Sequence, residues 1–356
     1  MALGGWKNRA GGQRRKPVKK QAEQTRNKNT MPARKRMRIA SGPVLFNWAP
    51  EQWRDFHFRL ADVEDVDIVH VGEVVCAKRH PFFEPYMAEV IERLFASGKQ
   101  VVLSALALAM NRNERSLIDS ITAMAGEASA SEETADEGGE GEGALIIEAN
   151  DLTALARLAG RRFVIGPFVN TYNALTVKEL AHLGAVRICL PPELGRQALS
   201  ALVPAMTDIG VEAEVFAFGR MPLALSARCY HARSHGLPKD GCRYVCGEDP
   251  DGLPLKTLDE EPFLAVNGIQ TLSYACLNLL GEIPLLKDMG VSVLRLSPHA
   301  TCDMAEVAAI FRAVADENMA VAEGLARLEA LKLPFPFANG YFHGQPGAAW
   351  LKPDPA

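Results

Sequence analysis

The sequence contains no uninterrupted run of about 18 apolar residues, the length that a helix needs to cross a bilayer. A membrane-spanning helix is therefore not expected. The basic N-terminus is not followed by the apolar core of a secretory signal peptide, so we expect a cytoplasmic protein. Thiols stay reduced in that compartment. The seven cysteines, an odd number, consequently favour metal or redox chemistry over a disulfide framework.

Several catalytic motifs are missing as well. The chain has no H-E-x-x-H zinc-protease helix, no G-x-S-x-G nucleophile elbow and no phosphate-binding P-loop. The glycines of "GGEGEG" at 138–143 follow an acidic stretch and precede the apolar run "ALIIE". They do not match the dinucleotide-binding fingerprint, which follows a strand and opens a helix. A hydrolase acting alone has no recognisable catalytic motif in this sequence.

The formal net charge of −4 conceals two biased segments. Residues 1–38 hold 13 Lys and Arg but one acid, Glu23. We interpret them as a disordered basic arm. Such an arm can attract nucleic acid or anionic lipid. The simpler interpretation is a dispensable extension, with Met31 and Met37 as other starting points, so no nucleic-acid partner is expected. Residues 126–143 hold seven acids and no base, which predicts a flexible acidic insertion.

Short apolar runs rich in Val and Ile alternate with amphipathic, helix-like segments. One such segment, 83–98, ends at a glycine stop. This alternation is typical of a parallel sheet covered on both faces, and eight units favour a (β/α)₈ barrel, an α/β fold, over an open doubly wound sheet. The domain is expected to span 39–350, followed by a tail at 351–356. The predicted strands are 44–48, 67–72, 100–105, 144–149, 162–167, 186–191, 212–219 and 291–298.

The seventh and eighth predicted strands are far apart in the chain. Strand seven ends near Gly219 and strand eight begins near Val291, which is a longer gap than a helical crossover needs. We therefore predict a long cysteine-bearing excursion at 220–290. Barrel chemistry sits in the loops that follow the C-terminal ends of the strands, so this position indicates function.

Three of the seven cysteines lie in apolar segments or at the start of a predicted helix. Cys189, in "VRICLP", is expected to be buried in strand six, and Cys276, in "SYACLNLL", is expected to be buried in an apolar helix. Cys302 is expected at the start of the helix after strand eight, a position that can lower the pKa of a thiol, and it stays a candidate without an assigned role.

The other four cysteines lie in polar loops. Cys76 follows strand two, and Cys229, Cys242 and Cys246 follow strand seven, so all four are expected at one end of the barrel. Four thiolates match either zinc or a [4Fe–4S] cluster, and reduced thiols without metal are the third reading. The usual two-knuckle zinc pattern is absent, although the histidines at 231 and 235 are able to replace thiols as zinc ligands.

Six further polar residues are candidates for substrate contact. Each is expected near the active end of the barrel or near the cluster, and capping of a helix is the alternative for the Asn and Glu side chains. They are Asn170, Asn173, Glu193, Arg228, His299 and His343.

Several stretches together resemble the U32 peptidase-like family, and within it the branch of oxygen-independent ubiquinone biosynthesis. They are "LFNWAPEQWRDFHFRLAD", "VDIVHVGEVVCAKRHPF", "EVFAFGRMPLALSARC", "GCRYVC", "NGIQTLSYACLNLL" and "NGYFHGQPGAAW", and the resemblance covers about residues 40–350. It implies a barrel-like fold and a [4Fe–4S] cluster. The implied ligands are Cys76 in "GEVVC", Cys229 in "SARC", and Cys242 and Cys246 in "GCRYVC".

The resemblance also implies partners and an activity. The chain is expected to pair with a UbiU-type homologue and to act with a UbiT-type lipid-binding protein on ubiquinone precursors, with prephenate as the oxygen donor. Phe218 stands where peptidase relatives often carry a histidine, which makes peptidase activity unexpected. Four thiolates would occupy all four irons, so electron transfer or a structural role is more natural for the cluster than direct binding of substrate.

Overall fold

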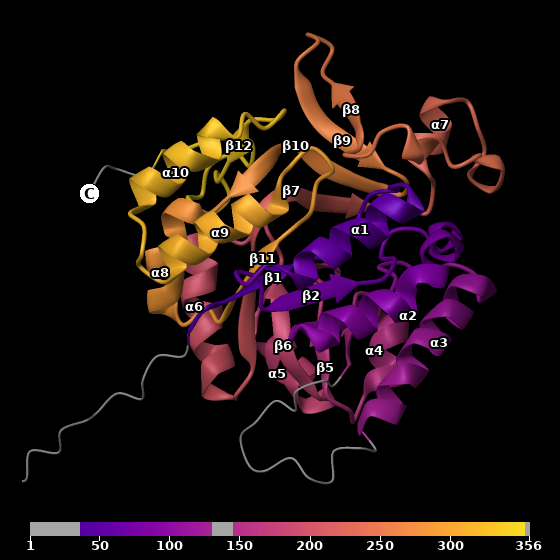
Figure 1. Ribbon diagram of the computed structural model, residues 1–356, viewed down its shortest axis with the longest axis horizontal. Helices are drawn as coiled ribbons and strands as arrows, with labels where there is room; N and C mark the ends of the chain where they lie inside the picture. The colour runs from indigo at the N-terminus through magenta and orange to yellow at the C-terminus, as the bar shows by residue number, and fades with distance from the viewer. Residues whose placement is uncertain (1–35, 130–144, 353–356) are drawn as a thin grey trace, which may run out of the picture. The chain divides into compact units, whose positions relative to one another are not determined.

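The computed structural model describes residues 36–129 and 145–352, which belong to one compact unit (Figure 1). Residues 1–35 of the basic arm, 130–143 of the acidic insertion and 353–356 of the tail lie outside the described residues. Within the described ranges, no helix is both long enough and apolar enough to cross a membrane.

Eight parallel strands close into a barrel. Each pairs with the next, and the last pairs with both its predecessor and the first, so the (β/α)₈ prediction is confirmed and the open sheet is excluded. Beta-branched and other apolar residues fill most strand positions, because both faces of the sheet are buried. The strands are β1 (Arg38–Ser41), β2 (Ile68–Val71), β3 (Gln100–Ser104), β4 (Ile146–Ala149), β5 (Phe163–Ile165), β6 (Ala185–Leu190), β7 (Glu212–Leu225) and β11 (Val293–Leu296).

Helices cover the outside of the barrel, and Figure 1 shows α1 to α4 lying along one side of it. Local caps fix several of their starts: the Asp151 and Asp303 carboxylates accept backbone N–H bonds at the beginning of α4 and α9. The helices are α1 (Pro50–Ala61), α2 (His80–Ala96), α3 (Arg112–Ser129), α4 (Leu152–Leu158), α5 (Ala174–Leu183), α6 (Arg196–Asp208), α8 (Ile283–Met289), α9 (Met304–Ala315) and α10 (Val321–Ala330).

Several boundaries differ from expectation. The first strand is Arg38–Ser41 and not 44–48, which is an irregular segment whose residues are all buried. This segment packs over the hydrophobic core without pairing with a strand. Its continuous burial therefore gives the same run of apolar residues as a buried strand. The predicted basic arm is too long, since Met37 is buried and Arg38 opens β1. Residues 126–129 of the predicted acidic insertion continue helix α3.

The segment between β7 and β11 carries a small antiparallel sheet. Strand β7 runs on past Gly219, and β10 (Gln270–Asn278) pairs with this extension. Strands β9 (Pro262–Asn267) and β8 (Leu253–Lys256) continue the sheet, and β12 (Phe337–Ala338) pairs with β10. Cys276 therefore lies in a strand, and its predicted helix is wrong: a short apolar run does not distinguish a buried strand from a buried helix.

Charged side chains fill the centre of the barrel. The Arg295 guanidinium donates to the carboxylates of Glu214 and Glu148, both at 2.6 Å. Arg187 lies 3.0 Å from the second Glu214 oxygen, and the Ser104 hydroxyl donates to Glu148. All four charged residues are buried. Burial alone would raise the pKa values of the two carboxyls, but Arg295 lowers that of Glu148, and Arg295 together with Arg187 lowers that of Glu214. The network neutralises itself inside the core.

Candidate metal centre

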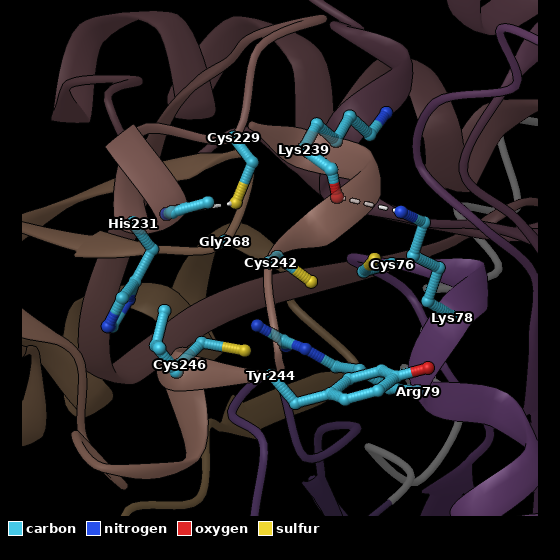
Figure 2. A pocket seen from close by; sticks show the side chains of 12 residues that line it. Cys76, Lys78, Arg79, Cys229, His231, Lys239, Cys242, Tyr244, Cys246 and Gly268 are labelled. Atoms are coloured by element: carbon cyan, nitrogen blue, oxygen red, sulfur yellow. Dashed lines mark hydrogen bonds between the residues drawn. The ribbon is translucent and has the colours of Figure 1, made fainter. Parts of the chain in front are cut away.

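Four cysteine side chains line one cavity (Figure 2). Cys76 comes from the loop after β2, and Cys229, Cys242 and Cys246 come from the excursion at 220–290. The structure therefore brings together all four thiols of the polar loops, although Cys76 and Cys229 are 153 residues apart in the sequence. The two loops meet because the extension of β7 carries the excursion beyond the barrel end, as Figure 1 shows near α7 (Tyr230–Ser234).

Cys76 is held by the turn that follows β2. The buried Glu73 carboxylate accepts the backbone N–H groups of Val75 and Cys76 at 2.8 and 2.9 Å. The Cys76 carbonyl then accepts from the Arg79 N–H and closes the short 3₁₀ helix Ala77–Arg79. These hydrogen bonds fix the Cys76 backbone independently of any bound ligand.

The other three thiols lie on short turns. Cys229 caps α7, where its sulfur accepts the Ala232 N–H at 3.4 Å. Cys242 follows the 3₁₀ helix Lys239–Gly241, and Cys246 is inside the 3₁₀ helix Val245–Gly247. Tight turns of this kind let three residues close in sequence present their sulfurs to one point.

Arg79 supplies a buried cation beside the sulfurs. Its guanidinium donates to the Leu45 carbonyl at 2.9 Å and to the Asn267 side-chain oxygen at 2.8 Å. Its Nε has no hydrogen-bond partner among the described residues. Gly268 permits this approach, because a Cβ there would lie 2.9 Å from an Arg79 nitrogen. The cation faces the place where thiolate charge would develop (Figure 2).

Burial of the thiols opposes the formation of negatively charged thiolates. It raises the pKa of the Cys76 thiol to about 11, although Arg79 lowers it, and it raises the pKa of Cys229 as well. Both thiols are therefore protonated at neutral pH. A metal that binds here must displace their protons, and the thiolate becomes the stable form only with a cation in place.

His231 adds a nitrogen donor to the same cavity. Its Nε2 lies 2.9 Å from the Asp249 carboxylate, and its buried Nδ1 has no partner among the described residues. The His235 ring stacks on it at 5.7 Å between centroids. One ligand atom from each of these three residues falls within 4.8 Å of the others. His231 thus lines the thiol cavity, whereas His235 does not; the two histidines form a separate group of candidate zinc ligands with Asp249.

The remaining cysteines lie elsewhere. Cys189 is buried in β6 and Cys276 in β10, and neither lines the cavity. Cys302 lies just before α9, and burial raises its pKa to about 12, so the helix terminus does not activate this thiol. Desolvation outweighs the helix dipole at this position.

The predicted substrate-contact residues are scattered, and none lines the thiol cavity. Asn173 caps α5 through the Thr176 N–H, and Asn170 ends a 3₁₀ turn in the left-handed region. His299 is buried and packs on Phe46.

Of the other three, Arg228 is exposed. Glu193 and His343 line a second cavity. Sequence reasoning missed Glu73 and Arg79, which lie three residues on either side of Cys76; their charge beside a candidate ligand was the available clue.

Comparison with known proteins gives one family and a set of distant folds. A model of peptidase family U32 matches residues 55–352. Among solved structures, the chain is similar to a tryptophan synthase complex from Pyrococcus furiosus, with 12% identity, a TM-score of 0.36 and coverage of 82% of this chain and 98% of that chain. It is also similar to the Bacillus cereus spore cortex-lytic enzyme SleL, with 9% identity, a TM-score of 0.39 and coverage of 80% and 75%. Likenesses this distant carry no argument about function.

Proposed function

Because the chain belongs to peptidase family U32, we propose that it is a UbiV-type member of that family: an iron–sulfur subunit required for O₂-independent hydroxylation of the ubiquinone ring during ubiquinone biosynthesis. Cys76, Cys229, Cys242 and Cys246 would hold a [4Fe–4S] cluster. The observation that carries the proposal is the meeting of these four thiols, from two distant loops, at one cavity beside a buried arginine.

The donor set fits such a group. Thiolates are the usual ligands of four-iron clusters, and clusters accept varied cysteine spacings. Four thiolates carry four negative charges. The 2+ charge of an oxidised four-iron core, or of a zinc ion, neutralises two of them. The buried Arg79 cation, with an unpartnered Nε, is the group that offsets part of the remainder. Lys78 and Lys239 also line this cavity, but each ammonium group is paired with a carboxylate, that of Asp240 and of Glu114 respectively.

Space is the more demanding criterion. The enclosed volume between the side chains is about 20 Å³, enough for one water-sized particle. A single metal ion enters with small adjustments, whereas a four-iron cluster requires the thiols to rotate outward. Cys76, Cys229 and Cys242 are only partly buried and lie on turns and short helices, which makes that rotation inexpensive. This small volume is the specific observation in favour of the alternative, a structural zinc site in a non-catalytic interaction protein.

The bound cluster would supply electron transfer. The chain's own residues hold the site: Glu73 fixes the Cys76 turn, and Arg79 links that turn to the Leu45 carbonyl and to Asn267 at the end of β9. Within the proposal, the protein works in the cytoplasm with a UbiU-type homologue and a UbiT-type lipid-binding protein. Ubiquinone precursors are the substrates, and prephenate is the oxygen donor.

The test is anaerobic purification followed by a UV–visible spectrum and iron, sulfide and zinc assays. We expect a brown protein with about four irons and four sulfides, lost in Cys229→Ala and in Cys242→Ala. Cys302→Ala is the matched control, since Cys302 does not line the cavity, and it should keep the colour. A colourless protein with one zinc would establish the structural alternative. Peptide hydrolysis that survives both Cys229→Ala and iron chelation would instead support a U32 peptidase.

A further inference from the structure

A second cavity lies at the C-terminal end of β6, between the start of α6 and residues 341–345. Its volume is about 860 Å³, within the range of small-molecule sites. It shares no lining residue with the thiol cavity. The C-terminal ends of the strands are the face on which barrel proteins bind their ligands.

The wall formed by the C-terminal segment is tightly built. The Phe342 carbonyl accepts the Arg196 N–H at 2.8 Å, which ties this segment to the first turn of α6. The Asn339 N–H donates to the Ala349 carbonyl, and the Asn339 side chain bonds both backbone groups of Leu351. The segment is thus folded back on itself, and the cavity is preformed.

His343 is held in one orientation by a buried carboxylate. Its Nε2 lies 2.9 Å from Glu282 Oε1, and the Asn339 amide donates to the same oxygen at 2.9 Å. Glu282 is only 6% exposed. These two contacts fix the position of the His343 imidazole at the wall of the cavity. The imidazole lines the cavity and is part-exposed.

Two opposite charges complete the lining. Arg196 is an exposed guanidinium on the first turn of α6. Glu193 is the acidic residue among those that line the cavity, and the Tyr172 hydroxyl donates to one of its oxygens. A ligand therefore meets a carboxylate-binding guanidinium together with an acceptor, the Glu193 carboxylate, beside the His343 ring. A ligand with no hydrogen-bond donor would leave the Glu193 carboxylate unmatched.

We propose that this cavity binds a small hydroxycarboxylate. Arg196 takes the carboxylate, Glu193 accepts the one hydrogen bond that the hydroxyl donates, and the His343 ring lies beside the ligand. Glu282 is a positioning residue that holds the imidazole in place. The inference does not depend on the cluster, since the two cavities share no lining residue.

The experiment uses the full chain and three probes: L-malate, succinate, which lacks the hydroxyl, and malamide, which lacks the carboxylates. Saturation-transfer NMR should show malate binding about tenfold tighter than succinate, and no transfer to malamide. Arg196→Gln should weaken malate binding about tenfold. Arg115→Gln, which changes an exposed arginine on α3, is the matched control and should leave binding unchanged. Cys229→Ala should also bind malate normally, which separates this inference from the cluster proposal.

A second readout localises the ligand. Malate should shift the ring resonances of His343, assigned by their loss in His343→Gln, while succinate should shift them less. Malate that binds equally well to Arg196→Gln, or that leaves the His343 resonances unmoved, would overturn the proposal. So would the absence of saturation transfer from malate to the folded wild-type chain.

Discussion

The Lys78 ammonium nitrogen lies 2.7 Å from the Lys239 carbonyl oxygen and 3.1 Å from an Asp240 carboxylate oxygen. This contact joins the loop that carries Cys76 to the excursion that carries the other three thiols (Figure 2). Among the described residues, no backbone hydrogen bond links Cys76 to Cys242. Lys78 is therefore a side-chain clasp between the two halves of the candidate centre.

Removal of the clasp should loosen metal retention. Lys78→Met keeps the aliphatic stem and deletes the charged donor, and the loss of one partly exposed hydrogen bond is about 1 kcal/mol. We expect metal to leave to a chelator about fivefold faster, measured by absorbance after anaerobic preparation. Lys178→Met, on the exposed face of α5, is the control. Equal release rates in the two variants would show that the clasp does not hold the loops.

Gly268 should be the most sensitive glycine near the centre. Its φ is +63°, and a Cβ would lie 2.9 Å from an Arg79 nitrogen. Gly268→Ala therefore combines backbone strain with displacement of the buried cation, and should lower the free energy of unfolding by about 2–3 kcal/mol. Urea denaturation measures the change.

Gly98→Ala separates the two causes. Gly98 has a φ of +74° but nothing within 4 Å of its Cβ position, so it reports strain alone, about 1 kcal/mol. Iron content should fall in Gly268→Ala and stay constant in Gly98→Ala. Equal destabilisation by the two substitutions would mean that the contact with Arg79 has no energetic weight.

The sequence predicts the barrel well because hydrophobic runs and helix stops recur with regular spacing. It fails at 44–48, because burial by packing over the core leaves the same pattern as burial in a ladder. It also gives no hint that Arg295, Glu148 and Glu214 neutralise each other, since their pairing depends on which strands face each other inside the barrel.

The candidate metal centre is likewise predictable from the sequence only in part. Polar context and position after a strand select Cys76, Cys229, Cys242 and Cys246 from the sequence, and the structure places them at one cavity. The approach of Gly268 to Arg79 is a product of tertiary closure, because the turn between β9 and β10 must first fold over the loop after β2. No sequence motif marks residues such as these, whose role depends on a contact formed only in the folded chain.

Stability should fall in mild acid because of His57. This histidine is 1% exposed, and burial lowers its pKa from the ordinary value of 6.5 to about 4. The unfolded chain binds the proton first, so stability is complete above pH 6.5 and declines as the pH falls toward 4. Between pH 7 and pH 5 the loss from this residue is about 2 kcal/mol. His57→Gln should flatten that part of the profile in urea titrations, and an unchanged slope would contradict the assignment.

Arg295→Met should be far more damaging than loss of a surface ion pair. The substitution leaves two buried carboxylates, Glu148 and Glu214, without the cation that lies 2.6 Å from each, and a broken buried pair costs about 3–5 kcal/mol. Arg157→Met is the comparison: Arg157 is 2.7 Å from Asp119, but both are about half exposed, so its loss is about 0–1 kcal/mol. Urea denaturation at pH 7 measures both changes.

The pH dependence distinguishes charge from packing in the same variant. Without Arg295, the pKa values of both carboxyls should rise, because burial alone favours their protonated form. The destabilisation of Arg295→Met should therefore shrink as the pH falls and the carboxyls take up protons in the folded state. Should the difference from wild type stay constant between pH 7 and pH 5, its cause would be the lost packing of the Arg295 side chain, and the barrel centre would not depend on charge balance.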